Sequence, residues 1–170
     1  MLMRLLTVVV ATLALAAAAL AGAADREPAA EIQPRVEHHI REAMVLSQHF
    51  EVLVGAECPR FPNVGEWNAY VEGEVDRMLL LAAHVEQAWV EAKRTGDDEV
   101  RRTAKAPRRR LDEARVLVDK LQGCAADHGT GFGPMGVWRR VEREVPRRQA
   151  EIALPDVPTS TSPSAAPVSQ

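Results

Sequence analysis

The chain has 170 residues, a formal net charge of −3 at pH 7, and only two cysteines, Cys58 and Cys124. This length is enough for one domain with a real apolar core, and two cysteines so far apart exclude a CxxCH haem attachment. The charge is uneven: residues 24–92 hold 13 acidic and 5 basic residues, whereas residues 93–152 hold 10 acidic and 15 basic residues. The two halves are complementary, so the simplest expectation is that they attract each other.

The first 23 residues have the pattern of a secretory signal peptide. Arg4 precedes an apolar run from Leu5 to Leu20, and Ala21-Gly22-Ala23 supplies the small residues that a signal peptidase needs. Because the run is short for a membrane span, we expect cleavage near Ala23 rather than an uncleaved anchor, and no stable span afterwards. The short charged region and the alanine-rich run indicate a bacterial signal, which predicts a periplasmic or extracellular mature chain.

Apolar residues then recur at helical spacing in four segments, and no segment alternates as a half-buried strand does. The predicted helices span residues 34–54, 64–94, 97–125 and 134–153. Asn63, with Glu66 three residues later, resembles a capping box at the start of the second helix. Pro107 lies within the apolar stripe of the third helix, so we expect one helix that is bent at that point.

Long helices joined by short loops favour antiparallel neighbours, so the sequence predicts an all-α, antiparallel up-down four-helix bundle over residues 24–154. This topology brings Cys58, after the first helix, and Cys124, late in the third, to the same end. In an oxidising compartment we expect one Cys58–Cys124 disulfide, and the alternative is two free or intermolecular thiols. Residues 155–170, which consist mainly of Pro, Ser, Thr, Ala and Val, are expected to form a disordered tail.

The two loops at the cysteine end collect aromatic and charged side chains. In a chain that is only 4% aromatic, this concentration indicates a candidate binding end. The alternative is that the rings plug the open end of the bundle above the disulfide, because aromatic side chains are large core fillers. The candidate binding-end residues are Arg60, Phe61, Trp67, Asp127, His128, Phe132 and Trp138.

A second candidate surface consists of basic residues that lie off the apolar stripe of the third helix: Arg101, Arg102, Lys105, Arg108, Arg109 and Arg110. The main expectation is a solvated face that pairs with the acidic first hairpin. The alternative is a surface for an anionic envelope polymer or an acidic protein. Nucleic acid is not expected, because the chain is exported and the basic stripe lacks interleaved aromatic residues.

Catalytic and metal-binding residues are scarce. Ser47 is the one serine between residues 24 and 154, both cysteines are expected to be oxidised, and the adjacent Asp127 and His128 have no nucleophile in view. His38 and His49 are expected on the helix face opposite the core. No haem motif, HExxH motif or paired Glu-x-x-His pattern occurs, so we expect no cofactor and no metal.

These patterns predict a secreted or periplasmic, non-catalytic binding or interaction protein, with an envelope protein or an anionic envelope polymer as its partner. The alternative is a small-ligand, haem or metal carrier that uses the bundle interior or the aromatic loop end.

Overall fold

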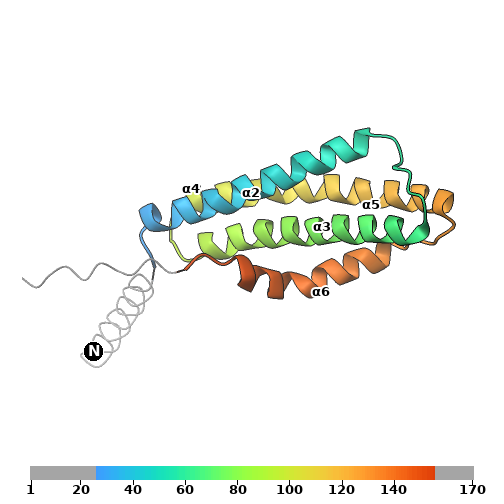
Figure 1. The fold of residues 1–170 in the computed structure, drawn as a ribbon. Coiled ribbons are helices and arrows are strands. Elements are labelled where there is room, and N and C mark those ends of the chain that lie inside the picture. The colour runs from blue at the N-terminus through green and yellow to red at the C-terminus, as the bar shows by residue number, and fades with distance from the viewer. Residues whose placement is uncertain (1–25, 156–170) are drawn as a thin grey trace, which may run out of the picture.

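The structure, a computed structural model, describes residues 26–155, and the regular elements of this range are all helical (Figure 1). In chain order they are α2 (Ala29–Gly55), α3 (Val64–Ala92), α4 (Asp98–Lys105), the 3-10 helix η1 (Ala106–Arg110), α5 (Leu111–Ala125), the short 3-10 helix η2 (Ala126–His128) and α6 (Pro134–Ile152). The predicted antiparallel four-helix fold is confirmed. The predicted signal peptide (1–23) lies outside the described residues, as does all of the predicted tail except Pro155.

The central helix is α3, which packs against α2 and α6 and also contacts α4 and α5. Figure 1 shows α2 and α6 on different sides of α3, with α5 running alongside α3 on the side of α2. The start of α3 is the predicted one: Asn63 Oδ1 accepts a hydrogen bond of 3.0 Å from the backbone N–H of Glu66. Such a cap satisfies a backbone donor that has no partner within the helix.

The segment from α4 to α5 differs from the single bent helix that the sequence predicts. Pro107 is buried at the expected place in the stripe, but it lies in η1, a 3-10 segment between α4 and α5. The physical reason is that proline lacks a backbone N–H and its ring clashes with the carbonyl four residues earlier. The stripe keeps its direction across this segment, because Ala104 before it and Ala114 after it are both fully buried.

Two apolar clusters fill the interior. The larger one joins α2, α3, α5 and α6 around Phe50, Trp67 and Met78. A smaller one, with Ile32 and Val100 among its members, joins α2, α3 and α4 at the opposite end. The bundle thus has two ends with different packing, and each end is closed by a different kind of cross-link.

One end is closed covalently. Cys58 and Cys124 form the predicted disulfide, with their Cα atoms 5.6 Å apart. Beside it, Lys120 Nζ donates hydrogen bonds to the carbonyls of Leu53 and Val54, at 2.7 and 3.2 Å. These carbonyls belong to the last turn of α2, where a cation offsets the negative end of the helix dipole. The disulfide and Lys120 together hold the end of α2 against α5.

The other end is closed by a buried ion pair. Arg35 on α2 donates two hydrogen bonds to the Glu91 carboxylate on α3, at 2.8 and 3.1 Å, and two to the carbonyls of Leu154 and Pro155, each at 2.7 Å. Glu91 also accepts from Arg94, at 3.0 Å. Burial alone would raise the pKa of Glu91, but the bonds from Arg35 and from a neighbouring glutamine hold that pKa below its usual value.

Removing the disulfide should weaken the fold strongly. The variant Cys58→Ser with Cys124→Ser is expected to lose about 4 kcal/mol of unfolding free energy, because the link closes a separation of 66 residues. Urea denaturation monitored by circular dichroism measures the loss. Reduction of the unmodified protein should give the same loss, and an unchanged midpoint after reduction would contradict the prediction.

Breaking the ion pair on one side should cost more than removing it entirely. Arg35→Met is expected to lower the unfolding free energy by about 3 kcal/mol, since it leaves Glu91 buried without its bidentate partner. Adding Glu91→Met should restore at least half of that loss, because neither charge is then buried unpaired. Denaturation curves of both variants test this, and a double variant that is weaker than the single one would refute it.

Candidate functional site

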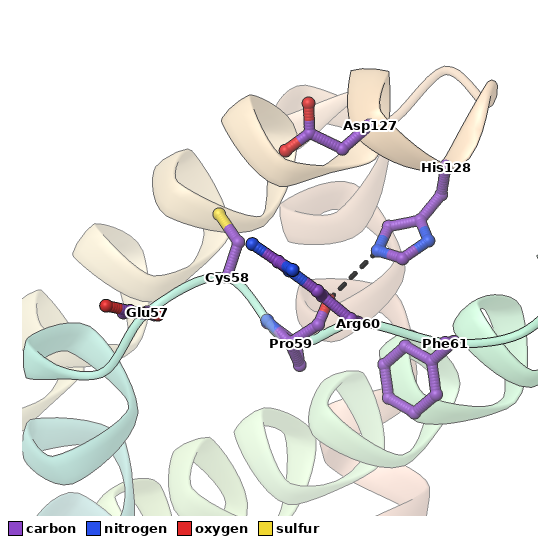
Figure 2. Close-up of a pocket in the computed structure, with 7 residues that line it drawn as sticks. All are labelled: Glu57, Cys58, Pro59, Arg60, Phe61, Asp127 and His128. Carbon is purple, nitrogen blue, oxygen red and sulfur yellow. Dashed lines mark hydrogen bonds between the residues drawn. The ribbon is translucent and has the colours of Figure 1, made fainter.

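The loop end forms a cavity beside the disulfide (Figure 2). It encloses about 550 Å³ and is lined by Glu57, Cys58, Pro59, Arg60, Phe61, Asp127 and His128. The first five residues belong to the loop between α2 and α3, and the last two belong to η2, which follows α5. The disulfide brings these loops together, so the cavity has walls from two segments about 70 residues apart in the chain.

Packed aromatic rings fill part of this end of the bundle. Trp67 is only 1% exposed, and the His128 ring stacks on it with centroids 4.4 Å apart and planes 14° apart. Phe61 packs against Trp67 and His128 at centroid distances of 6.2 and 5.9 Å. His128 Nε2 also lies 3.0 Å from the carbonyl oxygen of Pro59, and because a carbonyl only accepts, this nitrogen carries the proton. Of these three rings, those of Phe61 and His128 line the cavity, and the buried Trp67 ring packs against both.

The rim of the cavity carries charged side chains that are not packed as these rings are. Within residues 26–155, the side chains of Glu57, Arg60 and Asp127 form no ion pair and no hydrogen bond. In Figure 2 Arg60 and Asp127 come from opposite loops toward the same opening. A solvated pair of charges beside a braced cavity can bind a partner without first breaking an internal salt bridge.

Two of the seven predicted binding-end residues lie elsewhere. Phe132 lines a second cavity of about 450 Å³ between α3 and α6, with Val71, Val137 and Arg140. The Trp138 ring packs against the core and carries the Arg115 guanidinium 5.5 Å from its centroid. The glycine-rich segment before α6 leads the chain away from the disulfide, and the sequence pattern did not show this change of direction.

The basic surface is mainly paired within the protein. Arg110 contacts Glu51 on α2 at 3.2 Å, and Arg108 lies 3.8 Å from Glu86 on α3. Arg102 pairs with Glu99 within α4, and Arg101 lies 4.0 Å from Asp98. Two further pairs from α6, Arg140–Glu72 and Arg148–Asp76, join the basic half of the chain to the acidic half. The expected charge complementarity is therefore present as interhelical ion pairs.

One basic cluster is only partly paired. The charged groups of Lys93, Lys105 and Arg108 all lie near the ring of the half-buried Trp89, at 5.4, 4.9 and 5.6 Å from its centroid. Lys93 and Lys105 form no ion pair within the described residues. Sequence reasoning missed Trp89 and Lys93, because both belong to α3 or its C-terminal end and only the packing of α4 on α3 brings them to the basic residues.

The interior between α2 and α3 carries histidines. His39 Nδ1 and His84 Nδ1 lie 3.0 Å apart, so one of these nitrogens donates a proton and the other accepts it. Burial, followed by the nearby His84 and His38, lowers the pKa of His39 to about 4. Burial also lowers the pKa of His84. Both rings are therefore neutral at pH 7, and the pair is a structural contact of the core.

The placement of His49 corrects the sequence analysis. His49 does not lie away from the core: its Nε2 donates a 2.8 Å bond to the buried carboxylate of Glu74, which also accepts from Arg77. The physical reason is that α2 packs against both α3 and α5, so its buried side is wider than one apolar stripe.

The serine and the cysteines considered in the sequence analysis are engaged within the fold. Ser47 is buried and donates its hydroxyl proton to Glu113, and both cysteines form the disulfide. Among residues 26–155, no group of three or more His, Cys, Asp or Glu side chains is placed to hold a metal ion. In the same range, no helix combines the length and the apolar character that a membrane span needs.

Among known proteins, no protein-family model, no curated protein and no solved structure matches this chain.

The buried histidine pair should make the fold sensitive to acid. A folded pKa of about 4, below the unfolded value near 6.5, means that protonation favours the unfolded chain as the pH falls through this interval. We expect the unfolding free energy to fall by about 2 kcal/mol between pH 7 and pH 5. Urea denaturation at both pH values measures this. His39→Leu with His84→Leu should flatten the dependence, and an unchanged slope in that variant would rule out the pair as its source.

Proposed function

We propose that this protein is an exported, non-catalytic binding protein that presents its disulfide-braced loop end to an envelope protein. The signal-like first 23 residues support export to a periplasmic or extracellular location. The disulfide agrees with an oxidising compartment.

The observation that carries the proposal is the charged rim of the loop-end cavity. Arg60, Asp127 and Glu57 have no internal partner in the described chain, although most other charged side chains around the bundle are paired. The rim is held in place by the disulfide and by the bond from His128 to Pro59. The backbone of the rim is therefore braced and loses little conformational entropy when a partner binds, which favours recognition by this end.

A non-catalytic role fits the state of the groups that resemble an acid–base pair. His128 is stacked on Trp67, and its Nε2 proton is already donated to Pro59. Asp127 shares the cavity with His128 but makes no hydrogen bond to it. General acid–base catalysis needs a proton donor within reach of a reacting group, and here the donor serves the fold.

Site-specific crosslinking in the exporting cell tests this proposal. A photoreactive amino acid at Ala56, an exposed residue beside the rim, should give a discrete adduct with one envelope protein, whereas the same amino acid at Glu31, near the opposite end, should give none. Asp127→Lys should reduce the Ala56 adduct at least fivefold, because it reverses one charge of the rim.

A charge-matched control separates recognition from overall charge. Asp119 is an exposed acidic residue of α5, and Asp119→Lys makes the same charge change outside the cavity. It should leave the adduct intact. Equal loss in the two variants, or equal adducts from Ala56 and Glu31, would show that the loop end is not the binding surface.

A further inference from the structure

The cluster of cations around Trp89 lies far from the loop end. Trp67 at the cavity and Trp89 at the cluster are on the same helix, α3, and their separation in sequence corresponds to about 33 Å along the helix axis. A ligand of ordinary size at one place does not reach the other. The cluster is therefore a separate feature of the surface.

The cluster concentrates positive charge on one ring. Because Lys93, Lys105 and Arg108 are each within 6 Å of the Trp89 centroid, no two of their charged groups lie more than about 11 Å apart. Glu86, 3.8 Å from Arg108, is the one carboxylate paired with any of the three among the described residues. The ring's negative faces attract the cations, but the three positive charges repel one another.

The positive charge continues from Lys105 into the segments on either side of it. Arg101 and Arg102 precede it in α4, and Arg108 and Arg109 follow it in the 3-10 helix η1. Arg109 forms no ion pair within the described residues, whereas Arg101 and Arg102 pair with Asp98 and Glu99. With the rises of the two helix types, the row spans about 14 Å along the axis.

From this geometry we propose that the Trp89 cluster and its arginine row bind a linear anionic polysaccharide. A row of cations longer than one oxyanion matches a chain with repeated carboxylate, sulfate or phosphate groups. Lys93 and Lys105 are the main expected contacts to the ligand, because they can bind an anion without losing a carboxylate partner. Trp89 is a positioning residue that gathers the cations.

The apolar residues near the cluster do not favour insertion into a lipid bilayer. Binding to a membrane surface through a basic face usually includes an apolar face that enters the lipid. Here Val90 is the large exposed apolar residue next to Trp89, and α4 buries its own apolar residues, Val100 and Ala104, against the bundle. A hydrated polymer therefore fits the surface better than a vesicle does.

The test uses the full exported protein and dextran sulfate as the polyanion, with neutral dextran as the blank. Isothermal titration calorimetry should show binding to dextran sulfate only, with an affinity that falls as salt rises. Lys93→Gln with Lys105→Gln should weaken binding about tenfold, because two charge-assisted contacts are lost. It should also reduce the slope of log affinity against log salt by about two.

The matched control removes two positive charges elsewhere. Arg143→Gln with Arg147→Gln changes two exposed arginines of α6, with side chains 72% and 71% exposed, and should weaken binding less than twofold. Equal losses in the two double variants would overturn the proposal, because binding would then follow net charge alone. A lack of binding to dextran sulfate would overturn it as well.

Two further arms test the role of Trp89 and the class of ligand. Trp89→Leu should weaken binding about threefold, and Trp89→Phe, which keeps an aromatic ring, should restore most of the loss. Thermal melts establish that each variant is folded. Phosphatidylglycerol vesicles are the competing source of anions. If the protein binds them more tightly than dextran sulfate, and if this binding depends on Lys93 and Lys105, the ligand is a membrane surface and the polysaccharide proposal is wrong.

Discussion

The buried ion pair between Arg35 and Glu91 specifies how the helices of the bundle are arranged. Two charges removed from water are stable only when every hydrogen-bonding position finds a partner, and here the guanidinium reaches Glu91 on α3 and two carbonyls just after α6. Glu91 is shared with Arg94, which in turn holds Glu27 before α2 at 2.5 Å. This network is satisfied only when α2, α3 and the end of α6 arrive together, so it fixes one arrangement of the helices.

The apolar core alone would specify that arrangement less sharply. Much of it consists of valine, alanine and leucine, which pack acceptably in more than one relative rotation of neighbouring helices. Two further buried polar contacts join α2 to α3: His39 with His84, and His49 with Glu74. Each buried polar group penalises a slip of one helix on the other, because its partner would be lost.

The sequence predicts the helices and the disulfide well, since apolar spacing sets the buried direction of each helix and loop length sets the topology. It does not predict the polar pairs. Arg35 and His49 lie beside the apolar stripe, and a stripe gives no information about which residue of the next helix faces it. The Trp89 cluster escapes prediction for the same reason, because its cations come from different segments of the chain. Pro107 predicts a distortion, but the 3-10 segment depends on how α4 and α5 both fit against α2.

The charge imbalance along the chain explains why so few surfaces remain open to partners. The acidic first hairpin and the basic second half pair across helix boundaries, as in Arg110–Glu51, Arg140–Glu72 and Arg148–Asp76. Each exposed pair contributes little to stability, but it neutralises the surface where it lies. Of the charges without partners in residues 26–155, Glu57, Arg60 and Asp127 lie at the loop end, and Lys93 and Lys105 lie at Trp89, near the opposite end of α3. Because these five charges have no internal pair to break, the binding that we propose at each end gains electrostatic energy at little cost.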